Sequence, residues 1–122
     1  MSKPTLVAKF LLDSHGAPQV AYRGDPAHYR IELAVTNAPA DTYAVTYELH
    51  ESYYEPVRES RRRGDQFSEE ITSYGDYEVR ATVRGKARSQ VVVAELSEAL
   101  RRGHGRNPSP ALAKALRDIE SN

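Results

Sequence analysis

Three stretches of the chain alternate between apolar and polar residues with a period of two. The apolar sets are Tyr29, Ile31, Leu33 and Val35 in HYRIELAVT, Tyr43, Val45, Tyr47 and Leu49 in TYAVTYEL, and Tyr77, Val79, Ala81 and Val83 in DYEVRATVR. This period, together with many β-branched and aromatic side chains, is typical of strands that bury one face. The pattern therefore predicts three strands, each with an apolar face toward a core.

Four shorter segments also favour strands. They are residues 6–12, 19–23, 66–71 and 89–94. The stretches between the strand segments are rich in glycine, proline, asparagine and aspartate, which favour turns. About seven short strands separated by turns are typical of an antiparallel sandwich, in which two sheets cover each other's apolar faces. We therefore expect an all-β sandwich, with additional helices only near its end.

Those helices are predicted after residue 95. The stretch ELSEALRRGHG predicts a short helix that ends at Gly103. The stretch SPALAKALRDIESN predicts a second helix, with Ser109 as its N-cap and Pro110 in its first turn. The apolar stripe of the second helix consists of Leu112, Leu116 and Ile119.

We accordingly expect two parts, a sandwich domain over residues 1–95 and a helical extension over residues 96–122. The apolar stripe of the second helix has to be covered. One interpretation is that it packs on its own domain. The other is that it packs on a protein partner or on a second copy of the chain, as in a homodimer.

Composition and charge narrow the possible functions. The 122 residues suit one domain, and the absence of cysteine excludes disulfides and thiolate metal sites. With 17 basic and 17 acidic residues the formal net charge is zero, so neither nucleic acid nor a membrane is an expected partner. No segment approaches the roughly 20 apolar residues of a membrane span, and the first residues lack a signal-peptide pattern. We expect a soluble, cytoplasmic protein.

The stretch LHESYYEP concentrates polar chemistry at the end of the second alternating strand. His50 continues the polar face of that strand, so it points away from the core. A histidine near Ser52 can indicate nucleophilic catalysis. However, the two residues are only two positions apart, no third residue orients the histidine, and no strained elbow surrounds the serine. We expect no catalytic residues, and a hydrolase that uses His50 and Ser52 is the weaker alternative.

The remaining polar residues lack the spacing of a metal or cofactor site. The four histidines, His15, His28, His50 and His104, are scattered along the chain, so no metal and no cofactor is expected. The run Arg61–Arg63 predicts a solvated basic loop, with a phosphate or an acidic partner as the alternative ligand. The tripeptide that begins at Arg63, RGD, is interpreted as ordinary turn chemistry.

A second stretch with binding potential is TSYGDYEV, where Tyr74 precedes Gly75 at a predicted turn. In a sandwich, loops gather at the two ends. If this turn and the loop with Ser52 and Tyr53 share one end, two rings and a hydroxyl would lie close together. Such an arrangement would form a slot for a flat group.

Both stretches lie within a segment, Val45 to Arg84, that resembles the core of YEATS domains. Those domains carry a strand that ends in L-H-x-S-[FY], a proline and basic residues, then a short strand and a G-[WY]-[GA]-x-[FY] turn. The sequence has LHESY at Leu49–Tyr53, followed by Pro56 and Arg58, and SYGDY at Ser73–Tyr77. The resemblance implies an immunoglobulin-like antiparallel β-sandwich of about seven or eight strands.

The resemblance also implies a ligand and residue roles. Eukaryotic YEATS domains read acylated lysines on histone tails, and they hold the flat acyl-amide between two aromatic rings. By motif position the rings would be Tyr53 and Tyr74, the polar anchor would be the Ser52 hydroxyl, and His50 would brace the loop. Gly75 would bring the backbone close to the ligand.

The sequence departs from the YEATS pattern at several points. Position 73 is serine where the family usually has glycine, and position 53 is tyrosine where phenylalanine is commoner. The family's additional aromatic residue from an earlier loop has no clear counterpart in RGDPAH. The tail VVVAELSEALRRGHG is more similar to the prokaryotic branch of the family, whose members have no ordinary histone tails to read.

We therefore expect a non-enzymatic reader or sensor with an aromatic cage. Its ligand would be an acylated lysine on a protein or peptide, or a similar small planar acyl compound. The alternative is a structural or protein-interaction adaptor that uses the sandwich edge or the C-terminal helix and has no small-ligand pocket.

Overall fold

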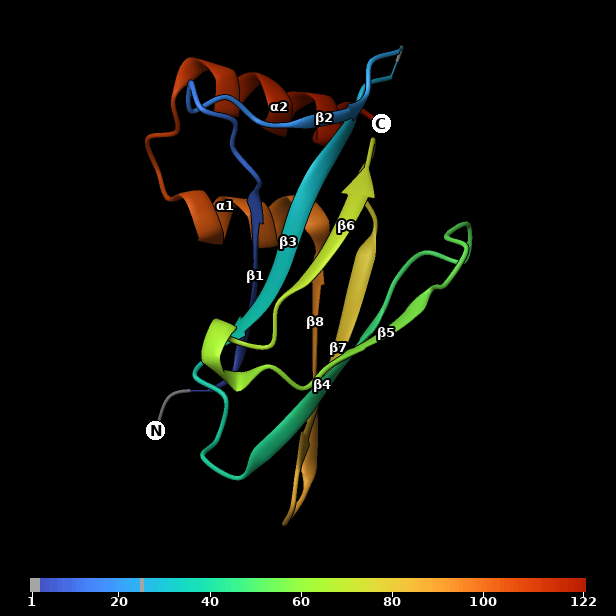
Figure 1. Cartoon of the computed structure of the whole chain (residues 1–122), viewed down its shortest axis with the longest axis vertical. Helices are drawn as coiled ribbons and strands as arrows, with labels where there is room; N and C mark the ends of the chain where they lie inside the picture. The colour runs from blue at the N-terminus through green and yellow to red at the C-terminus, as the bar shows by residue number, and fades with distance from the viewer. Residues whose placement is uncertain (1–2, 25) are drawn as a thin grey trace.

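The computed structural model describes residues 3–24 and 26–122 and contains two antiparallel sheets with two helices beside them (Figure 1). Its elements are β1 (Thr5–Phe10), β2 (Val20–Tyr22), β3 (His28–Thr36), β4 (Thr42–Glu48), β5 (Val57–Ser60), the 3-10 helix η1 (Arg63–Asp65), β6 (Glu69–Ser73), β7 (Glu78–Gly85), β8 (Ser89–Glu95), α1 (Leu96–His104) and α2 (Pro110–Ser121). The predicted β-sandwich is confirmed. Residues 1 and 2 of the predicted domain and Asp25 of the predicted RGDP turn lie outside the described residues.

The strand β3 is the centre of the first sheet, with β1 and β2 along one edge and β6 along the other. Tyr29 shows this arrangement directly, because it pairs with Val20 of β2 on one side and with Ser73 of β6 on the other. The second sheet has the order β5-β4-β7-β8, and all its neighbours are antiparallel. The two apolar faces pack against each other and form the core.

The alternation of β3 and β7 correctly predicts their buried faces. The predicted inward residues of both strands are buried, except Tyr77 at the cavity end, which is half-buried. In β4 the prediction is only partly right, because Tyr43 is exposed while Ala44 and Thr46 on the other face are buried. Side chains from the neighbouring strands cover that face, and Arg84 Nε donates a hydrogen bond of 2.8 Å to Thr46 Oγ1.

The chain between β5 and β6 differs from the prediction. The strand β5 is missed because its four residues show no apolar alternation, and β6 begins at Glu69 rather than at residue 66. Gln66 and Phe67 instead adopt left-handed backbone angles, with φ of 59° and 57°. The burial of the Phe67 ring explains this turn, since its carbonyl accepts a 2.7 Å hydrogen bond from the buried Tyr47 hydroxyl.

The predicted basic loop consists of arginines that all have partners within the chain. Arg63 donates to the carbonyls of Pro39 and Thr42 at 2.8 and 2.9 Å, and its guanidinium lies 5.3 Å from the Phe67 ring centre. Arg62 donates to the Ser68 carbonyl, and Arg61 pairs with Glu59. These contacts stabilise the turn around Phe67, so the arginine run serves the fold.

The helix α1 closes the side of the sandwich between β8, which it follows, and β1, along which it packs (Figure 1). Its inward residues Leu96, Ala99 and Leu100 are fully buried. The predicted end at Gly103 is wrong, because the helix continues to His104 and the C-cap is Gly105, which has a positive φ of 80°. Gly103 has another role: a Cβ atom there would lie 1.9 Å from the Ala8 carbonyl oxygen, so only glycine permits this close packing on β1.

The helix α2 forms as predicted. Ser109 is the N-cap, and its hydroxyl accepts a hydrogen bond of 3.3 Å from the Leu112 N–H. Leu116 and Ile119 of the predicted stripe are buried in the core of the sandwich, with Leu112 partly buried beside them. The boundary at residues 95 and 96, and a partner or second copy on α2, stay predictions.

His104 at the end of α1 is part of the packing rather than a loop residue. Its Nε2 accepts a hydrogen bond of 2.9 Å from the Phe10 N–H, and its ring stacks on the Phe10 ring at 5.6 Å. Burial lowers the pKa of His104 below its ordinary value of 6.5, and the nearby Lys9 lowers it further. The neutral imidazole is therefore the form that the fold requires, because a protonated Nε2 cannot accept the Phe10 hydrogen bond.

We predict that Gly103→Ala destabilises the protein by about 1–3 kcal/mol, a typical cost of overpacking, despite the better helix propensity of alanine. Gly64→Ala is the matched control, because a Cβ atom at Gly64 would have no neighbour within 4 Å. Urea denaturation measures both changes. Equal stability of the two variants would contradict the proposed close contact between α1 and β1.

We also predict a pH dependence that comes from His104. Folding lowers the pKa of His104, so the unfolded chain binds more protons than the folded one near this pH. The contribution of His104 to the free energy of unfolding is therefore greatest above pH 6.5 and declines as the pH falls below 6.5. His104→Gln places an uncharged acceptor near the Nε2 position and should have a flatter stability profile between about pH 7.5 and 5 than the wild type. Parallel profiles in denaturation experiments would contradict this role.

Candidate functional site

A cavity of about 600 Å³ lies at the end of the sandwich where the β4–β5 loop and the β6–β7 turn approach each other. Its lining residues are His28, His50, Ser52, Tyr53, Tyr54, Thr72, Ser73, Tyr74, Gly75, Asp76, Tyr77 and Asn122. The five residues predicted for ligand binding are all in this set. The fold thus brings together two sequence motifs, while the roles of the five residues toward a ligand stay predictions.

The imidazole of His50 organises the β4–β5 loop. Its Nδ1 accepts a hydrogen bond of 3.1 Å from the Ser52 N–H and lies 2.8 Å from Ser52 Oγ. A backbone N–H can only donate, so Nδ1 is the acceptor and the Ser52 hydroxyl donates to it. The lone pairs of Ser52 Oγ remain available to accept a hydrogen bond from a ligand.

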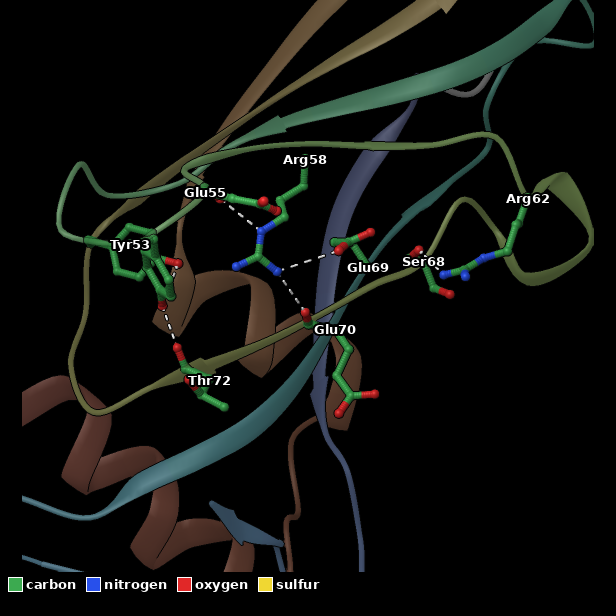
Figure 2. Close-up of polar contacts among 9 residues, drawn as sticks. Tyr53, Glu55, Arg58, Arg62, Ser68, Glu69, Glu70 and Thr72 are labelled. Atoms are coloured by element: carbon green, nitrogen blue, oxygen red, sulfur yellow. Dashed lines mark hydrogen bonds and ion pairs between the residues drawn. The ribbon is translucent and has the colours of Figure 1, made fainter. Parts of the chain in front are cut away.

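Tyr53 is held at both its backbone and its hydroxyl. Its N–H donates to the His50 carbonyl at 3.1 Å, and its hydroxyl donates to the Thr72 carbonyl at 2.5 Å (Figure 2). The hydroxyl also accepts a 3.1 Å hydrogen bond from Tyr77, whose ring centre lies 5.7 Å from that of Tyr53. Burial, with the adjacent Tyr53 hydroxyl, raises the pKa of Tyr77, so Tyr77 remains a neutral donor.

The bond from Tyr53 to Thr72 is one of three contacts along the free edge of β6. The carbonyls of Ser68, Glu70 and Thr72, at every second residue, accept hydrogen bonds from Arg62, Arg58 and Tyr53 respectively (Figure 2). Alternate carbonyls of an edge strand point away from the sheet, which explains the spacing. These three bonds, the β6-edge contacts, link the two sheets on this side and hold the β4–β5 loop against β6.

The β6–β7 turn is closed by the side chain of Ser73. Its Oγ donates to the Gly75 carbonyl at 2.8 Å and accepts from the Gly75 N–H at 3.3 Å. Serine at the usual glycine position therefore shapes the turn, and it leaves the Tyr74 ring 49% exposed at the cavity. The departure from the family pattern preserves a tight turn by side-chain hydrogen bonding.

His28 supports the Tyr74 ring, and sequence reasoning missed this residue. The two ring centres lie 4.9 Å apart with an angle of 38° between the ring planes. The Tyr22 ring in turn packs edge-on against His28, with the ring centres 5.3 Å apart. The stretch RGDPAH contains no phenylalanine, tyrosine or tryptophan, but the imidazole of its His28 is also a flat ring, which is the signal in the sequence that indicates this residue.

Gly75 meets the chain itself rather than open space. A Cβ atom at Gly75 would lie 2.8 Å from the carbonyl carbon of Asn122, just beyond the last turn of α2. The glycine thus permits a close approach of α2 to the turn. Asn122 was not predicted as a site residue, because its proximity depends on how α2 docks.

The rings of Tyr53 and Tyr74 line the same cavity from different loops. Their direct ring contacts within residues 3–24 and 26–122 are with other residues, Tyr77 for Tyr53 and His28 for Tyr74. Two rings that enclose a flat group must be separated by about 7 Å, twice the ~3.5 Å contact distance between carbon atoms. Two rings that line one cavity without contacting each other are therefore compatible with a slot.

Two further properties concern the part of the chain that the structure describes. None of its helices is long and apolar enough to cross a bilayer. Its histidine, aspartate and glutamate side chains form no group of three suited to a metal ion.

We predict that Tyr53→Phe destabilises the protein by about 1–2 kcal/mol, because it removes the Thr72 bond and leaves the half-buried Tyr77 hydroxyl without its acceptor. The control is Tyr54→Phe, whose ring is 97% exposed. Urea denaturation measures stability, and amide hydrogen exchange over residues 50–56 should become faster only in the Tyr53 variant. Identical exchange in the two variants would contradict the anchoring role of the hydroxyl.

Comparison with known proteins identifies the fold and the family. Residues 28–97 match the prokaryotic YEATS domain family, pYEATS. One similar solved structure is yeast Yaf9, an AF-9 homologue, with 16% identity, 100% of this chain and 99% of that chain covered, and a TM-score of 0.55. A second is the Yaf9 YEATS domain recognizing an H3K122suc peptide, with 16% identity, coverages of 92% and 87%, and a TM-score of 0.54. A third is the Yaf9 YEATS domain bound to H3K27ac, with 15% identity, coverages of 91% and 81%, and a TM-score of 0.52. No curated protein matches the chain significantly. At these identities the structures show a shared fold, and the match over more than half of the sequence shows that the chain belongs to the prokaryotic YEATS domain family.

Proposed function

We propose that this protein is a binding module that recognises an acylated lysine, or a similar planar acyl group, in the cavity between the β4–β5 loop and the β6–β7 turn. The observation that carries the proposal is the convergence of His50, Ser52 and Tyr53 with Tyr74 on one cavity. These residues come from two motifs that only the sandwich brings together. Two aromatic rings and a fixed hydroxyl are the groups that a flat amide needs.

The hydrogen bonds of the loop suit the two ends of an amide. The Ser52 hydroxyl donates a hydrogen bond to His50 Nδ1, so its oxygen would be free to accept a hydrogen bond from the N–H of an acylated lysine. The acyl oxygen needs a donor, and the Gly75 N–H is already bonded to Ser73 Oγ. The Tyr74 N–H is the better candidate. The carbonyls of Glu70 and Thr72 point away from the sheet at every second residue, and residue 74 is the next position in this alternation, so its N–H would also point outward.

The same geometry favours binding over catalysis. A hydrolytic serine needs a histidine that accepts its proton and a third group that orients the ring. The Ser52 hydroxyl does bond to His50 Nδ1, but Nδ1 also accepts the Ser52 N–H, and within residues 3–24 and 26–122 no group bonds to Nε2 to orient the ring, which meets Tyr77 edge-on at 6.0 Å. We therefore assign His50 the role of bracing the loop.

The related structures support an acylated peptide as the partner. The similar structures of the Yaf9 YEATS domain show it recognizing an H3K122suc peptide and bound to H3K27ac. For the chain described here we propose the chemical class, an acylated lysine side chain on a protein or peptide or a small acyl compound with the same planar group. Removal of the lysine charge by acylation is what would permit entry between two rings.

We predict that acetyl-, crotonyl- or succinyl-lysine peptides bind more tightly than the unmodified peptide of the same sequence. Isothermal titration calorimetry on the intact chain measures the four affinities. The flat acyl-amide would gain ring contacts and two hydrogen bonds, whereas a lysine ammonium would lose its hydration. Equal binding, or no binding, of all four peptides would contradict the proposal.

We also predict that Tyr74→Ala weakens the binding of the best acyl peptide by about 1–3 kcal/mol, a typical cost of losing an aromatic binding contact. The matched control is Tyr43→Ala, because Tyr43 has a similar exposed fraction, 43% against 49%, but is absent from the cavity lining. An affinity unchanged by Tyr74→Ala would exclude Tyr74 from the binding site.

A further inference from the structure

The end of α2 forms part of the cavity, although the site residues were predicted only in the two loops. Asn122 is a lining residue, and its main chain lies so close to Gly75 that a Cβ atom would meet it at 2.8 Å. Figure 1 shows the end of α2 beside the end of β6, where the β6–β7 turn begins. Gly75 and the end of α2 are therefore next to each other although they are far apart in the sequence.

A second contact links α2 to β3, the strand that carries His28. The hydroxyl of Tyr29 donates a hydrogen bond to the Asp118 carboxylate. Tyr29 pairs with Ser73 in the sheet and follows His28, the residue whose ring packs on Tyr74. The hydrogen bond lowers the pKa of Asp118, so the carboxylate stays ionised as a strong acceptor.

The two contacts depend on one another. Asn122 Nδ2 donates to the Asp118 carbonyl at 2.8 Å, so the end of the helix is tied to the residue that binds Tyr29. Ala115, Leu116 and Ile119 anchor the helix in the core, and Ile119 lies within the Asp118–Asn122 segment. The residues after Ile119 are exposed, so they can undock more easily than the buried turns.

We propose that the Asp118–Asn122 segment of α2 is a positioning element of the ligand site. The Tyr29–Asp118 bond ties α2 to β3, where the neighbouring His28 packs its ring on Tyr74. Asn122 packs on Gly75, the residue that follows Tyr74. Docking of this segment and filling of the cavity then stabilise each other, since any coupling between two sites is reciprocal. The ligand half of this inference rests on the proposed function, whereas the coupling between α2 and the turn does not.

Tyr29→Phe tests the coupling without a ligand, because it removes only the hydroxyl of a buried ring that is absent from the cavity lining. Amide hydrogen exchange of residues 73–77 and 118–122 should become faster in Tyr29→Phe and in Asp118→Ala. Lys114→Ala is the matched control, since it removes the exposed Lys114–Asp118 pair and leaves the Tyr29 bond intact. Exchange in β7 and β8 reports any global loss of stability.

Acetyl-lysine peptide titration gives the second readout. Tyr29→Phe should weaken binding about three- to tenfold, the effect of roughly one hydrogen bond, and Lys114→Ala should not. In the wild type, the peptide should slow exchange of residues 118–122. Unchanged exchange in Tyr29→Phe and Asp118→Ala would overturn the inference even if acyl peptides bind. If exchange changes as expected but no acyl peptide binds, the positioning role stands and the proposed ligand is wrong.

Discussion

The carbonyl groups on the free edge of β6 must find hydrogen-bond partners, and the solution to this constraint shapes the cavity end of the molecule. A second strand would satisfy them, but β5 belongs to the other sheet. Side chains satisfy them instead, and the β6-edge contacts hold the β4–β5 loop beside the β6–β7 turn. Of these contacts, the bond from Tyr53 to Thr72 joins two residues that line the cavity.

The opposite side of the sandwich is closed by close backbone packing. There α1 lies against β1, and Gly103 is needed because its missing Cβ allows contact with the Ala8 carbonyl. The same principle applies at Gly75, where α2 approaches the site turn. Each glycine marks a place where two backbones meet, so the helical extension contributes to the core and to the cavity alike.

Membership of the prokaryotic YEATS family and the cavity geometry lead to complementary conclusions. The family match covers the strands that carry both site motifs, but it ends at residue 97 and excludes α2. The family match therefore includes the residues of both motifs that line the cavity, whereas the contact of α2 with Gly75 is known from the structure of this chain. A rigid sandwich with recognition groups on its loops is a common arrangement for binding modules, because the strands hold the loops in place.

The sequence by itself determined the layers of the fold. Alternation specified the buried faces of β3 and β7, capping specified the start of α2, and motif spacing identified His50, Ser52, Tyr53, Tyr74 and Gly75 as candidates. These features are local, so they are readable from neighbouring residues. Only the tertiary structure decided the turn at Phe67, the anchoring of Tyr53 on Thr72, the support of Tyr74 by His28 and the arrival of Asn122 at Gly75. Each of these depends on segments distant in sequence, and no local pattern encodes which side chain will satisfy a backbone group on another strand.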